Sequence, residues 1–158
     1  MPKFYPLKVK DLYKDTEQCS IIEFDIPEDL KDKFKYKAGQ YLTLRETING
    51  EDIRRSYSLC SSPIDNEWKV AVKQIPDGKF STHVNQFLKK GDTLQVMKPM
   101  GRFGTTISEI PKNYIVFTAG SGITPILSMI KTHLAKEPNS TFKLFYLNRT
   151  VKSIIFKE

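Results

Sequence analysis

The sequence contains little cysteine and little histidine, and it has no long uninterrupted apolar run. Two cysteines, Cys19 and Cys60, occur among its 158 residues. They cannot build a disulfide scaffold or a four-ligand zinc site, so we expect no metal and a reduced, cytoplasmic setting. The longest uncharged stretch, 113–130, carries glycines and a proline in its second half, and the N-terminal residues lack a signal peptide's apolar core. We therefore expect neither a membrane-spanning helix nor secretion.

Acidic residues are also in deficit. The chain has 18 Asp and Glu against 25 Lys and Arg, which gives a net charge of +7. This balance favours an acidic protein, a phosphorylated ligand or a nucleic acid as partner, but a solvated basic surface explains it equally well. With 39% hydrophobic and 27% charged residues, the composition is that of an ordinary globular protein. The length corresponds to one domain of ~150 residues or to two small ones.

Up to about residue 105, the sequence consists of short segments with the pattern of β-strands, separated by turn sequences. The turn sequences include Asn49-Gly50 and Pro76-Asp77-Gly78. A helix capped by Ser81 and stopped by Lys89-Lys90-Gly91 interrupts them. The predicted strands are 7–10, 21–26, 41–44, 55–59, 68–75 and 93–97. Many short strands with turns between them predict a closed antiparallel barrel or a sandwich.

After Pro111 the pattern changes to strand, loop, helix and strand. Residues 114–118 form an apolar run typical of a parallel strand buried on both faces, and 142–147 form the next strand. Thr124 can cap a helix that begins at Pro125. A second helix is expected from Ser153 onward. The fold class predicted is therefore an antiparallel β-barrel followed by a partial α/β, Rossmann-like unit.

We place the barrel domain at 1–108 and the α/β part at 109–158. Two parallel strands and one helix do not complete a doubly wound sheet, because strand edges stay unpaired and apolar faces stay uncovered. We therefore expect the chain to be a fragment of a longer protein.

The segment Arg55-Ser56-Tyr57-Ser58 has the chemistry of a ligand site. An arginine and a tyrosine two positions apart on a strand point to the same side. The guanidinium fork matches a phosphate, and the tyrosine ring offers a flat face to a planar group. On these residues alone, an arginine-rich strand with a core tyrosine is an equally good interpretation.

Two further segments are suited to phosphate. Gly78-Lys79-Phe80-Ser81 stands just ahead of the short helix, where backbone amides bind anions well, although a plain turn also explains it. Gly120-Ser121-Gly122-Ile123-Thr124-Pro125 follows a strand and opens a helix, and its glycines let a pyrophosphate approach the backbone. It has Pro125 where the usual dinucleotide fingerprint has a third glycine.

In this order and spacing, the three segments resemble the R-x-Y-S flavin motif, the flavin-phosphate turn and the nicotinamide-nucleotide loop of the ferredoxin–NADP reductase family. The segment 99–104, Pro-Met-Gly-Arg-Phe-Gly, is similar to the family's P-x-G-x-F segment between domains. Asn148-Arg149-Thr150 resembles the segment after the second strand of its nucleotide domain. Within the family, the resemblance is to the reductase components of bacterial oxygenases of the phenylacetyl-CoA epoxidase type.

The resemblance implies roles for the matching residues. Tyr57 would stack on the flavin ring, and Ser58 would hydrogen-bond near the ring nitrogen that receives hydride, which makes these two the candidate catalytic residues. Arg55 and the turn 79–81 would hold the flavin phosphates, and Arg149 would meet the adenosine end of the nicotinamide dinucleotide, where a basic group favours NADPH. The cofactor-binding residues implied are Arg55, Ser56, Tyr57, Ser58, Val72, Lys73, Gly78, Lys79, Phe80, Ser81, Gly120, Ser121, Gly122, Ile123, Thr124 and Arg149.

The activity implied is that of a flavin-dependent oxidoreductase. Electrons would pass from NAD(P)H through FAD to an iron–sulfur centre or a protein acceptor such as an oxygenase component. The chain departs from the family because it ends before the later glycine and cysteine motifs, where an iron–sulfur module would lie. Leu147 also stands where this subgroup has a small residue. We therefore predict flavin retention with weak or absent turnover by this chain.

Two alternatives remain open at this point. A free flavin reductase would use flavin as a substrate and release it. A basic β-barrel that binds single-stranded nucleic acid would use Tyr57, Phe80 and the lysines, but it leaves the glycine loop unexplained, so we expect no nucleic acid partner. No catalytic triad is evident, since His83 and His133 have no partner in the pattern. We expect both histidines to be ordinary surface or helix residues.

Overall fold

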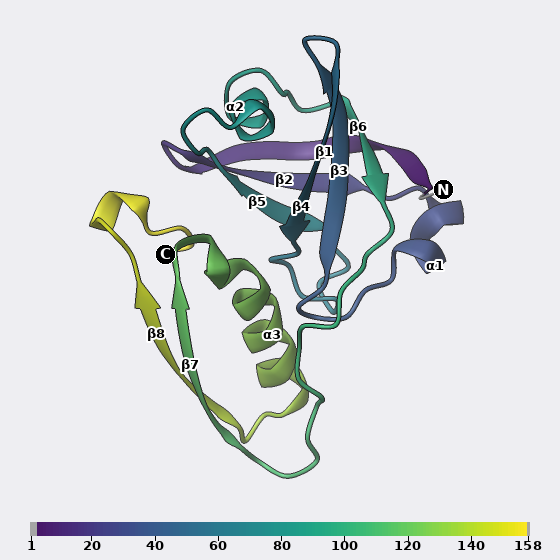
Figure 1. Cartoon of the computed structure of the whole chain (residues 1–158). Coiled ribbons are helices and arrows are strands. Elements are labelled where there is room, and N and C mark those ends of the chain that lie inside the picture. The colour runs from purple at the N-terminus through teal and green to yellow at the C-terminus, as the bar shows by residue number, and fades with distance from the viewer. Residues whose placement is uncertain (1–2, 158) are drawn as a thin grey trace.

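The computed structural model describes residues 3–157, which form two units in contact with each other (Figure 1). The first unit is a six-stranded antiparallel sheet in the order β4-β3-β6-β1-β2-β5. The second is a two-stranded parallel sheet, β7-β8, with a helix on one face. The strands of the first unit are β1 (Phe4–Thr16), β2 (Cys19–Asp25), β3 (Tyr41–Ile48), β4 (Glu51–Ser58), β5 (Lys69–Lys73) and β6 (Thr93–Met97).

The six-stranded sheet curls into a barrel. A bridge between Leu59 and Val70 brings the end of β4 beside β5, so the two edges of the sheet meet there. The curled inner face encloses one apolar core. Its fully buried members include Leu7, Phe24, Phe34, Leu42, Leu44, Val70 and Leu94. The antiparallel barrel predicted from the alternating pattern is confirmed.

The β3–β4 hairpin forms at the predicted turn. Asn49 and Gly50 both have positive φ, 50° and 80°, and the strands pair without interruption from Ile48↔Glu51 to Tyr41↔Ser58. Asn-Gly is the sequence that tolerates two such residues in succession, so the turn fixes the register of β4. That register presents the R-x-Y-S segment along one edge strand of the sheet.

The second unit consists of β7 (Asn113–Ala119), a 3₁₀ turn η2 (Gly120–Gly122), α3 (Ile123–Lys136), β8 (Thr141–Leu147) and a 3₁₀ turn η3 (Val151–Ser153). The strands pair in parallel from Asn113↔Thr141 to Ala119↔Leu147. This partial α/β unit is the one predicted. Expectations for its ends were wrong, because α3 begins at Ile123, before Pro125, and Ser153 closes a single turn rather than opening a helix.

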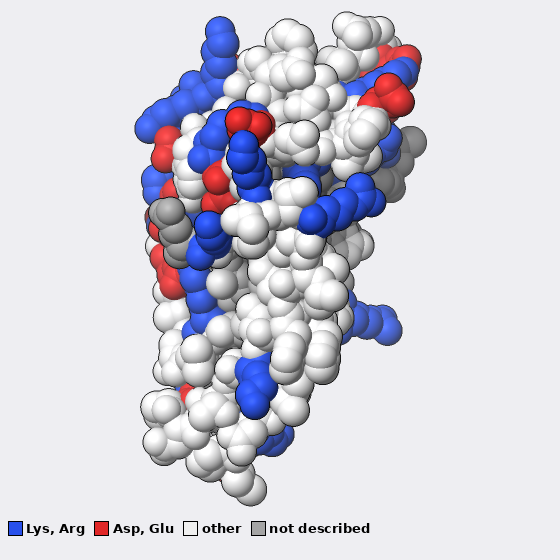
Figure 2. All heavy atoms as spheres, turned by 90° about the vertical axis from the view of Figure 1, so that its left-hand side faces the viewer, with Lys and Arg blue, Asp and Glu red and all other residues white. Residues whose placement is uncertain are grey.

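Only one face of the β7–β8 sheet is covered by the part of the chain that the structure describes. On the other face, Ile115 and Phe117 are 64% and 70% exposed, and the Phe117 ring stacks on Phe145 with centroids 4.7 Å apart. This exposure agrees with the prediction that apolar faces stay uncovered in an incomplete α/β unit, although the apolar run alone is typical of a strand buried on both faces. Figure 2 shows charged side chains over the barrel and a mainly uncharged surface over the second unit.

Helix α3 joins the second unit to the barrel. Its apolar residues Ile123, Ile126 and Met129 pack against Cys19, Ile21 and Ala71 on the outer face of β2 and β5. Polar contacts complete this interface. The Ser128 hydroxyl donates to the Ser61 carbonyl at 2.6 Å, and the Ser62 and Thr132 hydroxyls lie 2.8 Å apart. The loop that follows the R-x-Y-S segment is thus hydrogen-bonded directly to the helix that follows the glycine loop.

Several local features differ from the sequence predictions. A 3₁₀ turn η1 (Glu28–Leu30) and a short helix α1 (Lys31–Phe34) were not predicted. Helix α2 (Lys79–Gln86) begins two residues before Ser81, with Gly78 at its N-cap, and ends before the lysines. His133, expected to lack a partner, is buried against Glu137 and Thr105. Among residues 3–157, no helix is both long and apolar enough to cross a membrane.

Candidate functional site

Two adjoining clefts lie where the barrel meets the second unit. The barrel cleft, of about 760 Å³, is bordered by β4, by the loop after β5 and by the start of α2. The junction cleft, of about 1060 Å³, is bordered by that same loop and by the ends of β7 and β8. The residues common to both clefts are Lys73, Ile75, Pro76, Asp77 and Ser121. Ligands in the two clefts would therefore be neighbours.

The barrel cleft has an aromatic wall and a cationic edge. Tyr57 is half-buried, and its ring packs on the buried Phe80 ring with centroids 5.9 Å apart. Burial raises the pKa of the Tyr57 phenol from 10.0 to about 12, against a smaller opposing effect of Arg55, and the phenol is neutral at physiological pH with either value. Arg55 is exposed and donates one bond, to the Arg54 carbonyl at 2.7 Å. Its remaining guanidinium donors are available for an anion.

The start of α2 supplies the other anion-binding element. A Cβ on Gly78 would come within 2.4 Å of the Ser81 Oγ and 2.5 Å of the Ile75 Cγ1, so a larger residue there would have to displace both side chains. The Ser81 hydroxyl donates to the Gly78 carbonyl at 3.1 Å and accepts from the Ile75 amide at 3.3 Å. No side chain caps the helix. The first-turn amides therefore face outward at the positive end of the helix dipole, which favours phosphate.

Lys79 stands at the same helix end with a competing partner. Its Nζ lies 2.6 Å and 2.7 Å from the two carboxylate oxygens of Glu51. Both side chains are more than half exposed, so this ion pair contributes little to stability. Its effect is on the charge of the barrel cleft, because the Glu51 carboxylate offsets the positive charge that Lys79 brings there.

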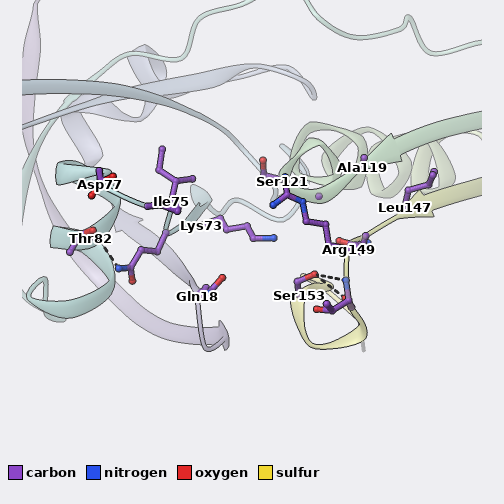
Figure 3. A pocket seen from close by; sticks show the side chains of 15 residues that line it. Gln18, Lys73, Ile75, Asp77, Thr82, Ala119, Ser121, Leu147, Arg149 and Ser153 are labelled. Atoms are coloured by element: carbon purple, nitrogen blue, oxygen red, sulfur yellow. Dashed lines mark hydrogen bonds between the residues drawn. The ribbon is translucent and has the colours of Figure 1, made fainter.

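The junction cleft is bordered by the carboxyl ends of two parallel strands, which is where open α/β sheets bind ligands. Gly120 and Ser121 come from the end of β7, and Arg149 follows β8. The Tyr146 hydroxyl donates to the Gly120 carbonyl at 2.9 Å and fixes the loop. In Figure 3, Lys73 from the barrel and Arg149 from the second unit extend toward one another across the cleft. The two cations are placed to meet a negatively charged ligand.

The structure brings most of the predicted site residues to these clefts. Lys73 and Ser121 border both clefts, and Gly120 and Arg149 border the junction cleft. The others, at the barrel cleft, are Arg55, Ser56, Tyr57, Gly78, Lys79, Phe80 and Ser81. Five predicted residues lie outside the clefts: Ser58, Val72, Gly122, Ile123 and Thr124.

The reasons for these positions are visible in the contacts that the residues make. Val72 is fully buried and its carbonyl accepts from the Asn85 Nδ2 at 2.9 Å. Thr124 donates to the Ser121 carbonyl at 3.0 Å and so holds the glycine loop rather than reaching a ligand. A Cβ on Gly122 would lie 2.8 Å from the Thr118 Oγ1, which explains the second glycine by packing. Ser58 pairs with Tyr41 at the end of β4.

Several residues that border the junction cleft were not among the predicted site residues. Thr150 and Ser153 follow a predicted parallel strand, and the rule that ligands bind at the carboxyl edge of such strands would have included them. Gln18, in the β1–β2 hairpin, belongs to no sequence motif that would have predicted its place at the junction cleft. Its position depends on α3 packing against β2, a contact between segments about a hundred residues apart.

Comparison with known proteins defines the class of this chain. Residues 6–104 match the sequence profile described as the oxidoreductase FAD-binding domain, and the chain belongs to that family. The barrel cleft fits FAD in chemistry, because it combines an aromatic wall, a guanidinium and a helix start without a side-chain cap that follows a closely packed glycine.

The relatives include oxygenase reductases. The chain is 40% identical to a subunit of 1,2-phenylacetyl-CoA epoxidase from Escherichia coli, an alignment that covers 100% of this chain and 45% of that protein. It is 39% identical to the ferredoxin reductase component of 3-ketosteroid-9-alpha-monooxygenase from Rhodococcus rhodochrous, over 96% of this chain and 43% of that protein. The chain thus spans less than half the length of these relatives.

Solved structures agree with this class. Phthalate dioxygenase reductase superposes with a TM-score of 0.78 at 28% identity, covering 97% of this chain and 46% of that one. The FAD/NAD-binding domain of nitric oxide dioxygenase from Vibrio cholerae gives a TM-score of 0.81 at 25% identity, covering 100% and 68%. The predicted resemblance to the ferredoxin–NADP reductase family, and the two-unit fold that it implied, are confirmed.

Proposed function

We propose that this chain is the flavin-binding half of an NAD(P)H-dependent oxidoreductase that passes electrons through FAD to an iron–sulfur centre or a protein acceptor. The observation that carries the proposal is the shared wall of the two clefts, at Lys73 and Ser121. It supports a flavin in one cleft beside a nicotinamide in the other. The names of the relatives are consistent with this, since they include reductase components of oxygenases.

The proposed roles follow from the geometry of the side chains. FAD, when bound, would supply the conversion of two-electron transfer from NAD(P)H into one-electron transfer to the acceptor. The protein would hold the two ligands in position. The Tyr57 ring would form the wall on which the flavin stacks, and Ser58 would lie at the end of the same strand. Arg55 and the amides of 79–81 would hold the flavin phosphates. Lys73, which borders both clefts, would lie between the two ligands, next to the buried Val72.

The nicotinamide dinucleotide would occupy the junction cleft. Gly120 and Ser121 would present backbone groups to its pyrophosphate, and Gly122, Ile123 and Thr124 would hold that loop in place. Arg149 would meet the adenosine end, where its charge favours a 2′-phosphate and hence NADPH. Because the chain spans less than half of its relatives' length, we propose weak nicotinamide binding and little turnover for these residues alone.

The electron acceptor would lie outside the described residues. Among residues 3–157, no group of three or more His, Cys, Asp or Glu side chains is arranged to hold a metal ion. Phthalate dioxygenase reductase is described as a modular structure for electron transfer from pyridine nucleotides to a 2Fe-2S group. We propose an acceptor of this kind in a further segment or in a partner oxygenase component. A cytoplasmic location belongs to the same proposal, and the two cysteines, which are both free, are consistent with a reducing compartment.

The test is flavin retention by the purified chain. We expect a flavin absorbance spectrum and stoichiometric FAD, identified by the mass of the ligand released on denaturation. Arg55→Ala should lose most of the bound FAD, because a phosphate contact is removed. Arg102→Ala is the matched control, since Arg102 is exposed and borders neither cleft. A cooperatively folded chain that takes up no flavin would refute the proposal, and flavin that washes out freely would favour a free flavin reductase.

A further inference from the structure

The segment after β8 is fastened to the barrel by a contact that the roles given above do not use. The Phe156 amide donates to the Asp15 Oδ2 at 3.0 Å, across 141 positions of the chain. The neighbouring Ile155 is completely buried in the apolar cluster that also contains Cys19 of β2. We call Asp15, Ile155 and Phe156 the clasp. Among residues 3–157, the bond to Asp15 is the one hydrogen bond that joins the segment after β8 to the barrel.

The backbone at Phe156 is held in an uncommon conformation. Its φ is +58°, in the left-handed region that a bulky side chain rarely adopts. Such a conformation persists where surrounding contacts hold it, and it occurs preferentially at functional sites. Here the contacts are the bond to Asp15 and the burial of Ile155. The clasp thus fixes the place where the segment after β8 meets the barrel.

One end of the clasp leads to the barrel wall of the junction cleft. Asp15 precedes Gln18, which borders the cleft, by three residues. The Gln18 carbonyl accepts from the Gln74 amide at 2.7 Å. Gln74 also borders the cleft, and it directly follows Lys73. The position of Asp15 is thereby tied to that of Lys73.

The other end of the clasp leads to the wall formed by the second unit. Phe156 follows Ser153, which borders the cleft, by three residues. The Ser153 hydroxyl donates to the Thr150 carbonyl at 2.9 Å and accepts from the Thr150 amide at 3.3 Å, and Thr150 directly follows Arg149. In Figure 3, Ser153 and Gln18 are both seen below the two cations that extend across the cleft. The position of Phe156 is thereby tied to that of Arg149.

We propose that the clasp sets the separation of Lys73 and Arg149. Asp15 and Ile155 are then positioning residues for a nicotinamide dinucleotide in the junction cleft, an inference that rests on the proposed function. A ligand that meets both walls binds best when the walls already stand at the right distance, because drawing them together on binding would cost free energy. No residue of the clasp borders either cleft, so the clasp acts through the walls and not through contact with the ligand.

The experiment compares Asp15→Ala with Asp15→Asn. Both variants lose the same negative charge, but asparagine keeps a side-chain oxygen that can accept from the Phe156 amide. NMR titration measures the dissociation constant of NADP⁺ for the FAD-loaded chain, and calorimetry measures that of FAD for the flavin-free chain. Asp15→Ala should weaken NADP⁺ binding about fivefold and change FAD binding less than twofold. Asp15→Asn should bind NADP⁺ at least as tightly as the wild-type chain.

A second variant and two controls separate wall separation from damage to the fold. Ile155→Ala should give the same pattern as Asp15→Ala, and Ile155→Val should largely restore NADP⁺ binding. Asp25→Ala removes an exposed carboxylate at the opposite end of β2 and should change neither constant. Adenosine 2′,5′-bisphosphate would meet only the Arg149 wall, so its affinity should be the same for Asp15→Ala and the wild-type chain. Each variant should melt cooperatively.

Three results would overturn the role of the clasp and leave the flavin site standing. They are unchanged NADP⁺ affinity in Asp15→Ala and Ile155→Ala, equal weakening of NADP⁺ and FAD binding, and an equal loss for adenosine 2′,5′-bisphosphate. A wild-type chain that binds FAD but not NADP⁺ would overturn the junction cleft as a nicotinamide site together with the clasp. A cooperatively folded wild-type chain that binds neither ligand would overturn the proposed function itself.

Discussion

The Nδ1 of His133 lies 2.9 Å from the Oε1 of Glu137, one turn further along the chain at the end of α3, and both residues are almost completely buried. The other ring nitrogen, Nε2, lies 2.8 Å from the Thr105 hydroxyl. Glu137 also accepts from the Ser108 amide at 2.6 Å and from the Tyr114 hydroxyl at 3.0 Å. Thr105 and Ser108 belong to the segment between the two sheets. This cluster therefore fastens the connecting segment to α3.

Glu137 should make the fold sensitive to acid. Burial alone would raise the pKa of its carboxyl, but bonds donated by Ser108, Ser140, His133 and Tyr114 outweigh burial and lower the pKa to about 2. The ordinary value is 4.5. The carboxylate therefore stabilises the folded state fully above about pH 4.5, and this contribution disappears as the pH falls toward 2. Urea unfolding between pH 7 and pH 2.5 should show this loss.

Glu137→Gln is the variant that tests this. It should lower the free energy of unfolding at pH 7 and flatten its dependence on pH below 4.5. Glu109→Gln removes the same charge at an exposed position and should behave as the wild-type chain. If Glu137→Gln kept the full acid dependence, the cluster would not be its source.

Gly39 should be intolerant of substitution because of a close approach as well as its backbone angle. Its φ is +93°, and a Cβ there would lie 2.1 Å from the Phe103 carbonyl oxygen. Gly91 has nearly the same φ, +92°, with nothing within 4 Å of the corresponding Cβ. Gly91→Ala should therefore cost only the backbone strain, about 1 kcal/mol, while Gly39→Ala should cost about 3 kcal/mol. If chemical denaturation showed the same loss of unfolding free energy for both variants, the chain near Phe103 would be able to move away from the new Cβ without cost.

The sequence predicted features that depend on local chemistry. The Asn49-Gly50 turn formed as expected, because two successive positive φ angles select those residues whatever the surroundings. The segments at Arg55, Gly78 and Gly120 border the clefts for the same reason, since each combines a turn or strand end with phosphate-binding groups.

Features that depend on long-range packing were not predicted. The partner of His133 is visible in the sequence as an i, i+4 pair, but the burial of both depends on the segment from Thr105 to Ser108 folding back over them. An uncovered apolar face was predicted for the incomplete α/β unit, but the apolar run did not reveal that Phe117 lies on that face. Local pattern therefore determined where the elements are, and tertiary contacts determined which residues face a cleft.

Tyr57 should act through its ring and not through its hydroxyl. The phenol is neutral at physiological pH, since the ordinary pKa of tyrosine is 10.0 and burial raises it further to about 12, and the ring packs on Phe80 at the cleft. Tyr57→Phe should therefore leave FAD affinity within about twofold of wild type, while Tyr57→Ala should weaken it about tenfold through the loss of a stacking surface. Calorimetric titration with FAD measures both. A large loss in Tyr57→Phe would assign a role to the hydroxyl instead.

Glu51 should restrain flavin binding, so its neutral variant should bind FAD more tightly. In the absence of ligand its carboxylate holds the Lys79 ammonium at 2.6 Å, which reduces the positive charge available to a phosphate at the start of α2. Glu51→Gln should strengthen FAD binding about threefold at low salt, and the gain should shrink as salt screens the exposed charges. Stability should change little, because both side chains are more than half exposed.

Lys79→Ala should have the opposite effect and weaken FAD binding. If Glu51→Gln weakened FAD binding, the carboxylate would be contributing to the site by positioning Lys79.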